Sequence, residues 1–329
     1  MQGNVVVLNN MVVAAYVPGL ESAEQAMSKA WQRGTFKFSL PLENSLKRTA
    51  DFMQRNNDRL RALSYALSAD FEPGTLDEIL KYQVAGRPWN ENELEVIVNQ
   101  FDAGRDTLKE LIDFLQATQV SMASLPTPDL DAIRSKLTGE QARIEQARRP
   151  NADILQKKKA QLESVNAAMD ILEKNNIESV FNGLLPSEKD LKKATSVVTA
   201  GQIDVELVCV ALEKLSKGLE RSLANMRYAS LITERQNLVN RIRDVEATTR
   251  EQDVRLLELA KQLGKLEEFG ALREHSLNWQ GIITQVLVAQ VAFSDELAQI
   301  HNERPLPLAK LSKVYARVSD YHNQLQGGR

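Results

Sequence analysis

The side chains that most often carry chemistry are few in this sequence and stand far apart. The three histidines, His275, His301 and His322, have no spacing that would place two of them on one metal ion, so no metal site is expected. The single cysteine, Cys209, cannot form an internal disulfide. It stands in an apolar stretch, where we expect it to pack as a small hydrophobic residue, and no cofactor is expected.

Motifs for catalysis or phosphate binding are not recognisable either. Glu267 and Glu268 fit an ordinary helix surface, and the glycine of LGKLEE, Gly264, lacks the strand and glycine-rich loop of a phosphate site. Lys157 to Lys159 could meet an anionic lipid, but so short a cluster more often forms a solvated helix face. The net charge of −3 gives no nucleic-acid footprint. The sequence therefore predicts a protein that is not an enzyme.

Long helices must position whatever sites exist. Of the 329 residues, 26% are charged and only 5% aromatic, and apolar residues recur at steps of three and four over long runs. A turn is expected at FNGLLPSEKD, and Pro150 is expected to kink the helix that contains it. The expected helices cover roughly 42–70, 94–124, 129–181, 187–269 and 279–300, and PLAKLSKVYARVSDYHNQL closes the chain.

These helices predict an all-α fold with two parts. Residues 1–128 and 225–329 should form an elongated tail bundle of about five long helices. Residues 129–224 should form a long antiparallel coiled-coil hairpin, a stalk with a head, which turns near Gly183 and Pro186. Roughly 80 helical residues at 1.5 Å each would span on the order of 120 Å, which predicts a rod.

The stretch SVVTAGQIDVELVCVALEKL, from Ser196 to Leu215, departs from the charged pattern around it. On a continuous helix, one narrow strip would be polar and the rest of the circumference apolar, with Asp204 interrupting the apolar side. The polar strip holds Thr195, Thr199, Gln202, Glu206 and Glu213. Such a helix suits either a buried core or a segment that faces lipid on one side and water on the other. The two interpretations are compatible, since a segment buried in one state can be released in another.

No conventional membrane or export signal accompanies this segment. The opening MQGNVVVLNNMVVAAYVPG has no basic region and is broken by Asn9 and Asn10, so it does not match a standard secretory signal. Nowhere does an uncharged apolar stretch reach the roughly 20 residues of an ordinary transmembrane helix.

Two stretches, NNMVVAAYVPGLESAEQA near the start and NGLLPSEKDLKKATSVV at the turn, add a family resemblance to this pattern. With the tail bundle, the central hairpin and its apolar head, the whole chain resembles the cytolysin A superfamily of α-helical pore-forming toxins. More narrowly, it resembles the B component of the binary xenorhabdolysin-type cytolysins.

The resemblance implies a lytic function that depends on a partner. Such a chain would be secreted without a recognisable signal peptide and stay a soluble monomer until it meets an A component and the lipid membrane of a target cell. The two components would then assemble into a hetero-oligomeric ring, and the head hairpin would insert to form the pore. The region 162–181 carries more charge than the downstream arm, which leaves open how much of it enters the bilayer. The alternative is a non-lytic coiled-coil scaffold or tethering protein.

The resemblance also assigns roles to residues of the head. The membrane-inserting residues would be Val197, Val198, Ile203, Val205, Leu207, Val208, Val210 and Leu212. The hairpin tip would comprise Phe181, Gly183, Leu184, Leu185 and Pro186. The pore lining would comprise Thr195, Thr199, Gln202, Glu206 and Glu213.

Overall fold

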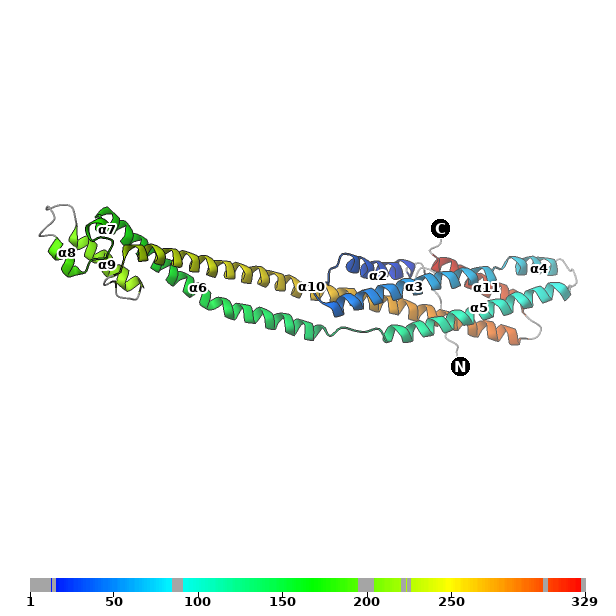
Figure 1. The fold of residues 1–329 in the computed structure, drawn as a ribbon. Helices are drawn as coiled ribbons and strands as arrows, with labels where there is room; N and C mark the ends of the chain where they lie inside the picture. Colours follow the sequence, from blue (N-terminus) through cyan, green and yellow to red (C-terminus); the bar gives the residue numbers. More distant parts are fainter. Residues whose placement is uncertain are drawn as a thin grey trace. The chain divides into compact units, whose positions relative to one another are not determined.

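The computed structural model describes residues 13, 16–84, 91–194, 204–219, 223, 226–303 and 307–326. The described part of the chain is built of α-helices and contains no strand, which confirms the predicted all-α fold (Figure 1). Contacts divide the chain into a bundle unit, residues 1–133 with 264–329, and a hairpin unit, residues 134–263. The predicted domain limits, 1–128 with 225–329 and 129–224, stay a prediction. The contact units place residues 225–263 with the hairpin.

The bundle unit is formed by helices whose apolar stripes face one another. Phe71 and Tyr315 meet edge to face with ring centroids 4.9 Å apart, and Phe36 and Phe269 do so at 5.2 Å. A side chain on Gly104 would come within 2.7 Å of the Phe71 ring, so only glycine allows this close approach. The helices are α2 (Tyr16–Gln32), α3 (Leu40–Asp70), α4 (Gly74–Val84), α5 (Glu91–Ala123), the second part of α10 (Tyr228–Asn302) and α11 (Leu308–Leu325).

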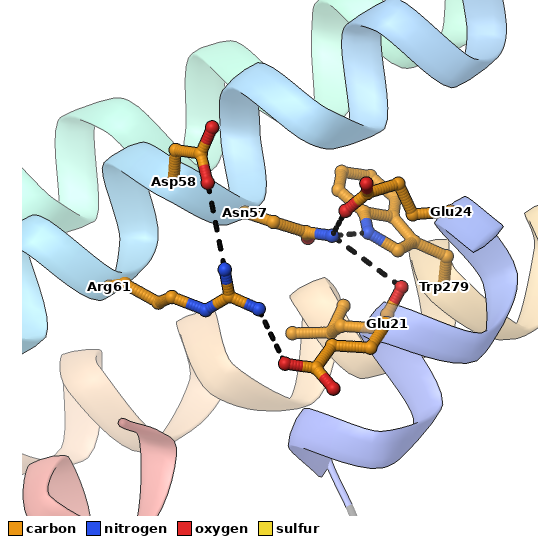
Figure 2. Close-up of polar contacts among 7 residues, drawn as sticks. Glu21, Glu24, Asn57, Asp58, Arg61 and Trp279 are labelled. Carbon is orange, nitrogen blue, oxygen red and sulfur yellow. Dashed lines mark hydrogen bonds and ion pairs between the residues drawn. The ribbon is translucent and has the colours of Figure 1, made fainter. Parts of the chain in front are cut away.

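A buried amide joins three helices inside this bundle (Figure 2). The side chain of Asn57 on α3 is 2% exposed and donates to Glu24 Oε2 on α2 at 2.9 Å. Its oxygen accepts a hydrogen bond from Trp279 Nε1 on α10 at 2.9 Å. Next to it, Arg61 pairs with Glu21 at 2.6 Å. Buried polar groups are stable only when they are paired, so this network fixes how α2, α3 and α10 pack.

The prediction of a separate helix from Trp279 to Ile300 is wrong about where this helix begins. Helix α10 continues without a break from Tyr228 to Asn302. The stretch FGALREHSLN before Trp279 holds no proline, and a single glycine, Gly270, does not end a helix.

The hairpin unit pairs α6 (Leu130–Lys174) with the first part of α10. No residue of α6 between Leu137 and Val165 is buried. Polar contacts hold the two helices along this stretch. They are Arg255 with Glu140 at 2.7 Å, Arg148 with Asp253 at 3.0 Å, Lys159 with Glu246 at 2.8 Å and Asn151 with Gln252 at 3.2 Å. The middle of this helix pair therefore has almost no apolar core of its own.

The predicted continuous helices 129–181 and 187–269 are also wrong. Helix α6 ends at Lys174, because Asn176 adopts a left-handed backbone with φ of 49°. The short α7 (Ile177–Val180) follows it, and the downstream run is divided into α8 (Glu188–Ala194), α9 (Val205–Leu219) and α10. Helix α6 does pass through Pro150 without ending there.

Candidate functional site

The end of the hairpin unit contains an apolar cluster that we call the head core. Its buried members come from α6, α7, the turn after α7, α8, α9 and the start of α10. They are Val165, Ala168, Met169, Leu172, Ile177, Leu185, Leu191, Val208, Ala211, Leu215, Tyr228, Leu231 and Leu238. The head core therefore collects residues up to about 70 positions apart in sequence, since Val165 and Leu238 both belong to it.

Helix α9 presents one face to the head core and another to solvent. Val208, Ala211 and Leu215 follow one another at steps of three and four and are at most 1% exposed. Leu207 and Val210, which lie outside this buried face, are 46% and 47% exposed. The two other predicted membrane-inserting residues within α9, Val205 and Leu212, are half-buried. The apolar side chains of α9 thus exceed what the head core uses.

The beginning of α9 is fixed by polar contacts. Asp204 lies outside α9, whereas a continuous helix through the valine-rich stretch would include it. Its carboxylate accepts a hydrogen bond from the backbone N–H of Leu207 at 3.0 Å, which is an N-cap. Its own N–H donates to Asn175 Oδ1 at 2.8 Å, and Asn175 is 8% exposed. Asp204 therefore marks the beginning of α9, whose first residue is Val205.

The predicted hairpin tip is tied back to the start of α10. Leu184 and Arg227 form an isolated antiparallel bridge, in which the N–H of Leu185 donates to Met226 O at 2.8 Å. Gly183 has φ of +76°, a conformation that favours glycine, and Leu184 is 44% exposed. Phe181 is half-buried, and Leu185 and Pro186 are buried.

Tyr228 makes a second connection between α10 and α6. Its hydroxyl donates to Glu173 Oε1 at 2.9 Å while its ring lies in the head core. Burial, together with this hydrogen bond to a carboxylate, raises the pKa of Tyr228 above its ordinary value. The hydroxyl therefore stays a donor at physiological pH. Sequence reasoning missed both Tyr228 and Asn175, although the pair Asn175–Asn176 is a typical helix-ending signal.

The predicted pore-lining residues are only partly within the described chain. Glu206 and Glu213 lie on α9 and are exposed. Glu213 pairs with Lys217 one turn later at 2.6 Å, and this hydrogen bond lowers the pKa of the Glu213 carboxyl. Outside the described residues lie Thr195, Thr199 and Gln202 of the predicted lining and Val197, Val198 and Ile203 of the predicted inserting set.

Helix α9 has 15 residues. Among the helices of the described chain, none combines the length and the apolar composition needed to cross a bilayer.

Comparison with known proteins gives a match in structure only. No family model matches the sequence, and no curated protein matches it closely enough to count. The crystal structure of XaxB from Xenorhabdus nematophila covers 94% of this chain and 96% of its own, with 16% identity and a TM-score of 0.76. PaxB from Photorhabdus luminescens covers 94% of each chain, with 13% identity and a TM-score of 0.68.

A chain of the XaxAB pore complex from Xenorhabdus nematophila also matches, with 15% identity and a TM-score of 0.53 over 94% of this chain and 96% of that one. The chain therefore has the fold of the B components of xenorhabdolysin-type binary toxins, as the sequence resemblance predicted.

Proposed function

We propose that this chain is the pore-forming subunit of a two-component α-helical cytolysin. It is secreted as a soluble monomer, assembles with an A component into a ring on the target membrane, and inserts its head hairpin to form a lytic pore. The observation that carries the proposal is the match to XaxB over 94% of this chain, which includes both the bundle unit and the hairpin unit.

The described conformation supports a soluble form that precedes assembly. Its TM-score is 0.76 against the crystal structure of XaxB and 0.53 against a chain of the XaxAB pore complex. In this conformation Val208, Ala211 and Leu215 are buried in the head core. A head that keeps its apolar residues packed away suits a chain that is inactive on its own.

The surface of α9 supports a second state. Leu207 and Val210 are about half exposed, so α9 carries apolar surface outside the head core as well as within it. Opening the head would add the buried face of α9 to this exposed face and produce an apolar surface much larger than a soluble monomer tolerates. A partner is needed to favour the open state, because only a ligand with different affinities for two states shifts their populations.

The test is lysis with and without the partner. The purified chain is added to red cells and to dye-loaded liposomes, alone and together with a candidate A component, such as the helical product of a neighbouring gene. We expect little leakage from the chain alone and rapid leakage from the pair. Equal leakage by the chain alone would contradict the partner requirement. No leakage with any A component, despite stable association with it, would favour the scaffold or tether instead.

A further inference from the structure

The wall of the bundle unit contains a hollow of about 190 Å³. It lies between α2, α3, α10 and the turn that follows α5, far in sequence from the head core. Met27, Leu46 and Phe269 line it and are each at most 7% exposed, and Met122 and Leu125 extend the apolar wall. Well-packed interiors leave few voids larger than a water molecule. An apolar cavity of about 150 Å³ accepts benzene, so this hollow has room for one aromatic ring.

Polar groups without partners adjoin the apolar wall. Thr49 lines the hollow at 9% exposure, and its hydroxyl makes no hydrogen bond within the described chain. Arg273 also lines it, is exposed, and forms no ion pair or hydrogen bond with a described residue. The neighbouring hydroxyl of Ser45 is occupied, because it donates to Pro126 O at 3.0 Å. The hollow therefore offers the hydroxyl of Thr49 and the guanidinium of Arg273, both without a partner among the described residues, beside an apolar wall.

We propose that this hollow binds a small aromatic carboxylate. The ring would lie against the thioethers of Met27 and Met122, since sulfur atoms make favourable contacts with aromatic rings. Phe269 offers a further aromatic surface to the same ring. The carboxylate would accept charge-assisted hydrogen bonds from Arg273, which is the cationic residue among those that line the hollow. The site goes beyond the proposed function and does not depend on it.

The experiment uses the full chain, labelled with ¹³C at its methionine methyl groups. Adding 3-phenylpropionate in large molar excess should shift the Met27 and Met122 signals and leave Met169, in the head core, unchanged. The neutral analogue 3-phenylpropanamide should bind about tenfold more weakly, because it lacks the charge that Arg273 would pair with. Absence of any shift at Met27 and Met122 would overturn the proposal.

Two variants locate the site. Arg273→Gln should weaken 3-phenylpropionate binding about tenfold and leave binding of the amide unchanged, whereas Lys109→Gln, an exposed cation of α5 outside the hollow, should change neither. Ser276→Leu should fill part of the hollow and abolish both. Equal affinities of acid and amide for the wild-type chain would show that Arg273 has no role. Unchanged binding to a folded Ser276→Leu chain would place the ligand elsewhere, and if that variant does not fold, the Arg273→Gln comparison decides.

Discussion

His322 lies fully buried on α11, with its Nε2 3.0 Å from Gln290 Oε1 of α10. The amide oxygen can only accept, so Nε2 carries the proton, and Nδ1 has no partner in the described chain. The ring of Tyr321 packs beside it with centroids 5.4 Å apart. Neither neighbour carries a charge at neutral pH, so burial alone lowers the pKa of His322 to about 3.

This burial predicts a pH-dependent stability of the chain. The folded pKa of His322 is below the ordinary value of about 6.5, so the unfolded state takes up the proton first as the pH falls. The free energy of unfolding that neutral His322 contributes is fully present above about pH 6.5 and is lost progressively toward about pH 3. Between pH 7.5 and pH 5 we expect a loss of about 2 kcal/mol, at 1.36 kcal/mol per unit. Urea unfolding of the wild type and of His322→Gln measures it.

The variant should lack this part of the pH dependence, although it is less stable at pH 7.5. His275→Gln is the matched control, because His275 is exposed on α10. The explanation by burial is refuted if His322→Gln and the wild type lose the same stability between pH 7.5 and pH 5.

Within α9, two valines that look equivalent in the sequence differ in their burial. Val208 is 0% exposed and Val210 is 47% exposed. Val208→Lys would bury an unpaired charge in the head core, and we expect it to destabilise the hairpin unit by about 3 kcal/mol or more. Val210→Lys should change stability by less than about 0.5 kcal/mol. Limited proteolysis and urea unfolding distinguish the two, and equal effects would mean that α9 does not pack as described.

The cap of α9 gives a second prediction at this scale. Asp204→Ala removes the acceptor for the N–H of Leu207 and should cost about 1 kcal/mol. The loss should be local, so amide hydrogen exchange should accelerate in α9 and stay unchanged in the bundle unit. Glu206→Ala, two residues further along the chain and exposed, is the control. Uniform acceleration over both units would show that Asp204 supports the whole chain instead of one helix.

At the scale of the whole molecule, the insertion proposal predicts a periodic pattern of environments. Single cysteines placed from Thr199 to Glu213 in a Cys209→Ser background are labelled with an environment-sensitive dye. On adding liposomes and the A component, the fluorescence emission of the dye should shift to the blue at positions 205 and 208 and stay unchanged at positions 202 and 206. An absence of periodic change despite leakage would show that another part of the chain enters the bilayer.

The assembled ring also predicts an effect on ion selectivity. Glu206 is exposed on α9, so Glu206→Lys should preserve folding and leakage. If this side chain lines the pore, one charge per subunit is reversed and the preference of the pore for cations should fall. Reversal potentials across planar bilayers measure this. Lys214→Glu, an exposed residue of α9 outside the predicted strip, should leave selectivity unchanged.

Helices with a strong local signal, such as α3 and α5, could be predicted from the amino-acid sequence alone. Helix α3 was predicted as 42–70 and extends over Leu40–Asp70, because a stripe of leucines at steps of three and four is a local signal. The resemblance to a B component, which rests on the opening stretch, the turn stretch and the predicted architecture, was likewise confirmed as a fold.

The points at which the helices of the head end depend on contacts between residues far apart in sequence. The periodicity predicts a continuous helix through Asp204. In the structure, Asn175, 29 residues earlier, accepts a hydrogen bond from the backbone N–H of Asp204, and α9 starts after it. Which face of α9 is buried depends on Leu172 and Tyr228, which reach the head core from other helices. Periodicity records that a side chain is apolar. It does not record which distant partner covers it, and burial is set by that partner.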